Sequence, residues 1–119
     1  MKLTPEQTLL MLHLKELGID AVAEVRVCQE RKWRFDIAEE GWPVWRRPLA
    51  FEIEGGQWVR GRHTRGSGFQ SDLEKYREAV VRGWLLLRFS PQEVRDGTAK
   101  RFVAERVLRH SGESHEAKS

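Results

Sequence analysis

The 119-residue chain lacks several features of secreted and membrane proteins. Its one cysteine, Cys28, cannot form an internal disulfide, which favours a reducing compartment. No apolar run approaches the roughly 20 residues that a transmembrane helix needs. The N-terminus also lacks a basic region followed by a small-residue cleavage site, so we expect no secretory signal. The sequence therefore predicts a cytoplasmic protein with no membrane association.

No great excess of charge of either sign is present. Twenty-one Lys and Arg side chains oppose 18 Asp and Glu, which gives a net charge of +3 and a pI of about 9.4. Most of the positive charge comes from arginine, whose planar fork donates two hydrogen bonds at once to a phosphate. The net charge alone does not establish nucleic-acid binding, so the position of the arginines matters more than their number.

Apolar periodicity and capping signals predict one α/β domain over residues 1–110, followed by a disordered polar tail over 111–119. The first helix starts at Thr4 with a capping-box pattern and ends at Gly18. Further helices are predicted over 70–82 and 98–110, with another helix start at Ser90. Strands are predicted over 21–27, 33–37, 49–54 and 84–89, the last as a buried strand. This order predicts one sheet covered by helices.

The predicted strand over 49–54 separates its side chains onto two faces. Because residues two apart share a face, Leu49, Phe51 and Ile53 should pack into the core. Glu52 and Glu54 should point to the opposite side. Two neighbouring carboxylates repel one another unless a cation lies between them, which makes this pair a candidate cation ligand set.

The strand before it offers a third acid. We expect Phe35 and Ile37 to face inward and Asp36 to point to the opposite side, so three carboxylates would converge if the two strands are neighbours. Hard cations such as Mg²⁺ or Mn²⁺ take oxygen ligands and keep several waters, so two or three carboxylates suffice. The alternative is a solvated sheet face on which Glu52 and Glu54 lie beside cations such as Arg34.

The segment from 55 to 70 contains five glycines and no acid. Arginines and aromatic residues on a glycine-rich backbone suit contacts with DNA phosphates and exposed bases. The candidate DNA-binding residues are Trp58, Arg60, Arg62, His63, Arg65 and Phe69. The alternatives are a solvated basic loop and, for His63, an incidental histidine.

The helix that follows carries a polar face and an apolar face. The polar face comprises Asp72, Lys75, Tyr76 and Ala79. The apolar face, which we expect to point inward, comprises Leu73, Val80 and Trp84. Lys75 could reach the acids and stabilise the transition state of a phosphate reaction, or it could form an ordinary surface ion pair with Asp72.

Four motifs together resemble the PD-(D/E)XK nuclease superfamily, in particular its short branch related to very-short-patch-repair and phage endonucleases. They are Phe35-Asp36-Ile37-Ala38, the run from Leu49 to Gly56, the pair Asp72 and Tyr76, and the run from Gly83 to Phe89. The similarity covers roughly residues 4 to 95. It implies a restriction-endonuclease-like core, in which a mixed four-stranded sheet in the order α-β-β-β-α-β is flanked by helices, with an extra C-terminal helix.

The resemblance implies a role for each acid. Asp36 matches the first acid of the family motif, Glu52 the second, and Glu54 occupies the position at which the family usually has lysine. Other branches supply that lysine from the next helix, where Lys75 lies. The implied catalytic residues are Asp36, Glu52, Glu54 and Lys75, with Mg²⁺ or Mn²⁺ held by the three acids. Glu6 lies where junction-resolving relatives often carry a further acid.

The implied function is a metal-dependent endonuclease of a bacterium or of a phage-infected cell, cutting duplex, nicked or branched DNA by structure rather than by sequence. One alternative is a Holliday-junction resolvase of the same superfamily, which would act as a homodimer because two cuts need two sites related by two-fold symmetry. Two alternatives from other classes are a non-catalytic DNA-binding module and a structural or assembly protein.

Overall fold

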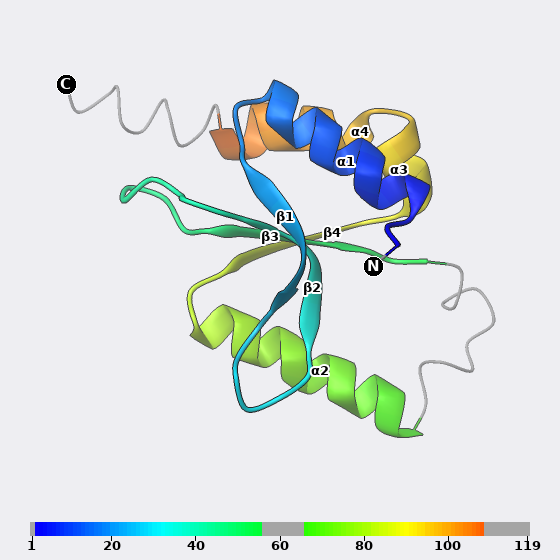
Figure 1. Ribbon diagram of the computed structural model, residues 1–119, viewed down its shortest axis with the longest axis vertical. Helices are drawn as coiled ribbons and strands as arrows, with labels where there is room; N and C mark the ends of the chain where they lie inside the picture. The colour runs from blue at the N-terminus through cyan, green and yellow to red at the C-terminus, as the bar shows by residue number, and fades with distance from the viewer. Residues whose placement is uncertain (1, 56–65, 109–119) are drawn as a thin grey trace.

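The chain folds into a four-stranded mixed sheet with helices on both faces, as seen in a computed structural model that describes residues 2–55 and 66–108 (Figure 1). The elements are α1 (Pro5–Glu16), β1 (Ala21–Arg26), β2 (Arg34–Glu39), β3 (Leu49–Ile53), α2 (Gly66–Val81), β4 (Leu85–Phe89), α3 (Pro91–Arg95), α4 (Thr98–Phe102) and the π-helical turn η3 (Val103–Leu108). Helices α1, α3 and α4 cover one face, and α2 covers the other.

The strands follow the order β1-β2-β3-β4 in the sheet. β1, β2 and β3 pair antiparallel, whereas β3 and β4 pair in parallel through the α2 crossover. The predicted α/β class, element order and mixed four-stranded sheet are confirmed. β4 lies at the edge of the sheet and is less buried than predicted: most of its side chains are partly exposed, although Leu85 and Leu87 pack against the core.

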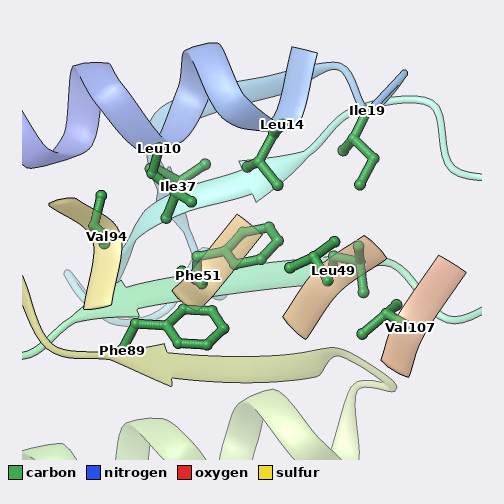
Figure 2. Close-up of a cluster of buried hydrophobic side chains, with 11 residues drawn as sticks. Leu10, Leu14, Ile19, Ile37, Leu49, Phe51, Phe89, Val94 and Val107 are labelled. Atoms are coloured by element: carbon green, nitrogen blue, oxygen red, sulfur yellow. The ribbon is translucent and has the colours of Figure 1, made fainter. Parts of the chain in front are cut away.

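The larger core lies between α1 and the sheet (Figure 2). Helix α1 starts where predicted: the Thr4 hydroxyl accepts from the Gln7 amide, and the Gln7 side chain accepts from the Thr4 amide. Its inner residues Leu10 and Leu14 are fully buried against the strands. The core cluster comprises Leu10, Leu14, Ile19, Ile37, Leu49, Phe51, Phe89, Val94, Ala99, Val103 and Val107.

Small side chains bring α2 close to the other face of the sheet. Ala79 of α2 packs in one cluster with Ala38 of β2 and Ala50 of β3. The prediction that Leu73 and Val80 point inward is wrong, because their side chains are 38% and 58% exposed. The inner face of α2 is instead the face that carries Lys75 and Ala79, both of which are buried. Helix α2 also begins at Gly66, before the predicted start at residue 70.

The C-terminal part of the chain differs from the predicted single helix over 98–110. Helix α4 ends at Phe102, and the backbone continues as the π-helical turn η3. Val103 and Val107 are buried, whereas Phe102 is 38% exposed and packs edge-on against Phe89. The predicted disordered tail over 111–119 lies outside the described residues.

A buried ion pair fixes the start of the β2–β3 connection. The Arg46 guanidinium donates twice to the Glu39 carboxylate, at 2.8 Å each, and Glu39 also accepts from the Leu49 amide. Both charged side chains are almost fully buried. We expect Arg46→Ala to lower the free energy of unfolding by about 3–5 kcal/mol, because it leaves the Glu39 charge buried without a partner. Urea denaturation at neutral pH measures this, and a loss below about 1 kcal/mol would contradict it.

Candidate active site

The sheet is irregular where Glu24 of β1 lies opposite Asp36 of β2. The β1–β2 ladder pairs Ala23 with Ile37 and Val25 with Phe35, and the position between these pairs has no backbone bridge. Glu24 adopts a left-handed backbone conformation with φ 58°, which is uncommon for a residue with a side chain. The pairing of β1 with β2 is therefore irregular where Glu24 lies opposite Asp36.

This irregularity contradicts the prediction that Phe35 and Ile37 point to the same side. Phe35 and Ile37 do not share a face of the sheet: Phe35 packs in the cluster under α2, and Ile37 packs in the cluster under α1. Strict alternation cannot hold across Asp36, because the backbone departs from regular strand geometry there. The sequence gives no signal of this break, since residues 33–37 alternate regularly.

The carboxylates of Asp36 and Glu52 each accept a hydrogen bond from a backbone amide of the neighbouring strand. The Asp36 amide donates to Glu52 Oε2 at 2.8 Å, and the Ile53 amide donates to Asp36 Oδ2 at 2.8 Å. These two side-chain bonds replace the backbone pairing of β2 and β3, whose ladder stops at Ile37 and Phe51. Two of the predicted acids are therefore held side by side by reciprocal hydrogen bonds.

Lys75 of α2 reaches this pair. Its Nζ lies 2.6 Å from Glu52 Oε1, and both residues are nearly buried, with 9% and 6% of their surfaces exposed. The ion pair forms because the polar face of α2 points to the sheet. The prediction that Lys75 reaches the acids agrees with this geometry, and the alternative of a surface pair with Asp72 does not.

Glu54 has a separate set of partners. The Arg88 guanidinium donates to Glu54 Oε2 at 2.9 and 3.2 Å, and the Tyr76 hydroxyl lies 3.4 Å from Glu54 Oε1. Arg88 also stacks over the Tyr76 ring at 4.3 Å. Neither Arg88 nor Tyr76 was among the predicted catalytic or binding residues, although both lie in motifs that carry the family resemblance. The one signal for Arg88 is that it interrupts the apolar run of β4.

An open cavity of about 420 Å³ lies beside Asp36, at the end of α1 that carries Thr4. Its lining residues are Lys2, Thr4, Glu6, Gln7, Glu24, Asp36, Ile53, Gly55 and Pro91. Glu6 is held by Arg95 at 2.8 Å, which neutralises its charge. Of the three predicted cation ligands, Asp36 lines the cavity and Glu52 and Glu54 do not.

The predicted DNA-binding segment falls mostly outside the described residues. The residues outside the described ranges are Trp58, Arg60, Arg62, His63 and Arg65. Their role in DNA binding therefore stays a prediction. Phe69, in the first turn of α2, is described and exposed.

The predicted convergence of three carboxylates is only partly present. Over 2–55 and 66–108 no group of three or more His, Cys, Asp or Glu side chains is arranged to hold a metal ion. What the structure brings together is the pair Asp36 and Glu52, with Glu54 turned towards Arg88. Two carboxylates suit Mg²⁺, which binds through one or two carboxylates, several waters and substrate phosphates. The cavity beside Asp36 leaves room for such waters.

The surroundings of Asp36 and Glu52 disfavour the charged forms of both carboxyl groups. Burial is the largest cause that raises the pKa of both Asp36 and Glu52. Lys75 opposes the rise for both, while Asp36 raises the pKa of Glu52, and Glu24 and Glu54 raise that of Asp36. A further cation at this pair would relieve this unfavourable charge.

These shifts predict how stability depends on pH in metal-free buffer. The folded chain binds protons at Asp36 and Glu52 more readily than the unfolded chain, so their contribution to the free energy of unfolding rises as the pH falls from their raised pKa values towards about 4. We expect Asp36→Asn to be more stable than the parent at pH 7, with a smaller advantage at pH 5. Paired urea titrations measure this, and an advantage that grows on acidification would contradict it.

No family model, curated protein or solved structure matches this chain. Among the described helices, none is long and apolar enough to cross a membrane.

Proposed function

We propose that this chain is a metal-dependent endonuclease that hydrolyses phosphodiester bonds in DNA, with a restriction-endonuclease-like fold of the PD-(D/E)XK type. The observation that carries the proposal is the pair Asp36 and Glu52, joined across adjacent strands and backed by the buried Lys75. Two acids from neighbouring strands and a lysine are a charge arrangement that suits a cation and a phosphate together.

The topology also supports the proposal. The resemblance implied the order α-β-β-β-α-β, and the chain has that order with β3 and β4 parallel across the α2 crossover. The site residues come from β2, β3, α2 and β4, so the sheet and one helix fix their positions. A site built on regular elements holds its side chains more precisely than one built on loops.

Asp36 and Glu52 would hold Mg²⁺ or Mn²⁺, which supplies a bound water of lowered pKa and polarises the phosphate. Lys75 neutralises Glu52 in the free protein, and its flexible chain allows its ammonium group to turn towards a phosphate oxygen in the complex. Arg88 has a 44% exposed side chain held by Glu54 and Tyr76, and it would contact a neighbouring phosphate.

The substrate is proposed to be recognised by its backbone and shape rather than by its sequence. The charged side chains at the site are those that bind phosphate, and no described helix presents an evident row of base-reading side chains. Trp58, Arg60, Arg62, His63, Arg65 and Phe69 remain the proposed further DNA contacts.

The test is cleavage of end-labelled linear duplex, nicked duplex, flap and four-way junction DNA with Mg²⁺ or Mn²⁺, each with and without EDTA. We expect metal-dependent cutting of at least one substrate. Paired symmetric cuts confined to the junction would favour the resolvase alternative. Salt-dependent binding without cleavage would favour a non-catalytic module, and no binding at all would favour a structural role.

A further inference from the structure

The amide side chain of Gln7 links α1 to the irregular part of the sheet. Gln7 Nε2 donates to Glu24 Oε2 at 3.0 Å and to the backbone carbonyl of Asp36 at 3.3 Å. Its carbonyl Oε1 accepts from the Thr4 amide at 2.9 Å, which fixes the orientation of the group. Gln7 is a buried polar residue whose side-chain bonds are thus directed at Asp36 and its neighbour.

Glu24 of β1 is the second residue that Gln7 joins to α1. Its carboxylate accepts from Gln7, and its left-handed backbone lies opposite Asp36, where the ladder has no bridge. Residues with a side chain rarely adopt this conformation, and such strain persists only when the surroundings hold it in place. The Gln7 bond is one such restraint, because it joins both irregular strands to the first turn of α1.

This arrangement determines how Asp36 is presented. The Asp36 amide is held by Glu52 and its carbonyl by Gln7, so its backbone is held on both sides. With the backbone fixed, Asp36 bonds to the Ile53 amide through Oδ2 while lining the open cavity. Glu24 and Gln7 line the same cavity.

We propose that Gln7 and Glu24 are positioning residues that hold Asp36 in its metal-binding orientation through the backbone of β2. The inference rests on the proposed function and goes further, because it assigns roles to two residues outside the acid and lysine set. Neither side chain touches the cation or the DNA in this proposal. Outer residues that orient a metal ligand typically change metal affinity by about 10–100-fold when they are replaced.

The test measures Mn²⁺ binding to the whole chain by isothermal titration calorimetry. Gln7→Met keeps a similar length but removes the amide, and we expect it to raise the Kd for Mn²⁺ at least about 10-fold. Glu24→Gln keeps an oxygen that accepts from Gln7. Its Kd for Mn²⁺ should therefore stay within about 3-fold of the parental value, clearly below the 10-fold rise expected for Gln7→Met. The control is Glu6→Gln, a cavity residue bound by Arg95 instead, which should leave the Kd unchanged.

Glu24→Gly separates positioning from stability. Glycine adopts positive φ without strain, so the thermal midpoint should not fall, while the Kd for Mn²⁺ should rise about 10-fold because the Gln7 partner is lost. A merely structural role would instead make the two measurements change together. If Gln7→Met and Glu24→Gly both keep the parental Kd, the proposal is wrong. If Glu24→Gln loses Mn²⁺ as fully as Asp36→Asn, Glu24 is itself a ligand and positioning is again wrong.

A metal-free measurement distinguishes this inference from the proposed function. We expect Gln7→Met and Glu24→Gly to lower hydrogen-exchange protection of the Asp36 and Ile53 amides in EDTA buffer, because both amides depend on the held geometry. Lowered protection in a chain that binds no Mn²⁺ would leave the positioning role in place and refute the metal-dependent function. Unchanged protection refutes positioning, whatever the metal affinity.

Discussion

Asp36→Asn and Glu52→Gln should each lower the rate of metal-dependent DNA cleavage by at least about 100-fold. Replacing an outer residue that only orients a ligand already costs about 10–100-fold, so removing a charge from the ligand pair itself should cost at least the upper end of that range. Asn and Gln keep an oxygen for the bonds from Ile53 and from Asp36, so the strand pairing survives. The change is therefore confined to charge in Asp36→Asn, whereas Glu52→Gln also breaks the ion pair with Lys75.

The matched control for these variants is Glu39→Gln. Glu39 lies on the same strand as Asp36, is buried, and has a cationic partner in Arg46. Unlike Asp36, it does not line the cavity. We expect Glu39→Gln to lower stability while retaining cleavage at a temperature where the protein is folded. Cleavage by Asp36→Asn at the parental rate would remove the basis of the nuclease proposal.

Mn²⁺ should also stabilise the parent protein and not the Asp36→Asn variant. A ligand that binds the folded state alone, at about 100 times its Kd, raises the free energy of unfolding by about 2.7 kcal/mol. Thermal denaturation with Mn²⁺ and with EDTA measures this without any DNA. This measurement distinguishes loss of metal binding from loss of DNA binding or cleavage. A variant that cuts DNA poorly but is still stabilised by Mn²⁺ must be defective in a step after metal binding.

Lys75→Met should lower the free energy of unfolding by about 3–5 kcal/mol in EDTA buffer. The substitution leaves the Glu52 carboxylate nearly buried without its cation, and breaking such a pair on one side is strongly destabilising. The pKa of Glu52, already raised by burial, should rise further when Lys75 no longer opposes it. The variant should therefore regain part of its lost stability below neutral pH.

A second substitution tests this explanation. In Lys75→Met/Glu52→Gln both charges are gone, while the amide oxygen introduced at position 52 can still accept from the backbone amide of Asp36. We expect the double variant to regain most of the stability lost by Lys75→Met, because replacing both members of a buried pair is often neutral or stabilising. A double variant as unstable as the sum of the single ones would show that Lys75 acts through packing rather than through Glu52.

The sequence was sufficient to predict the parts of the fold that depend on local signals. The capping box at Thr4 and the apolar alternation of the strand over 49–54 lead to the right elements in the right order. Period and capping depend on near neighbours in the chain, which is why they can be read without knowledge of the tertiary structure.

The sequence was insufficient where tertiary contacts outweigh local pattern. Leu73 and Val80 made one side of α2 look like its inner face, but the short side chain of Ala79 and the buried bond from Lys75 to Glu52 decide which side approaches the sheet. The partner of Glu54 was missed for a similar reason. Arg88 comes from the parallel strand β4, whose register with β3 is set only after the crossover.

The parallel pairing of β3 with β4 also affects the order in which the molecule folds. β1, β2 and β3 are joined by short antiparallel connections, whereas β4 can dock only after α2 has crossed the sheet, and such distant pairings form slowly. Asp36 and Glu52 lie on strands joined by a local connection, so we expect their contact to form before Lys75 and Arg88 dock. We therefore expect the two acids to lack their cationic neighbours in the early stages of folding.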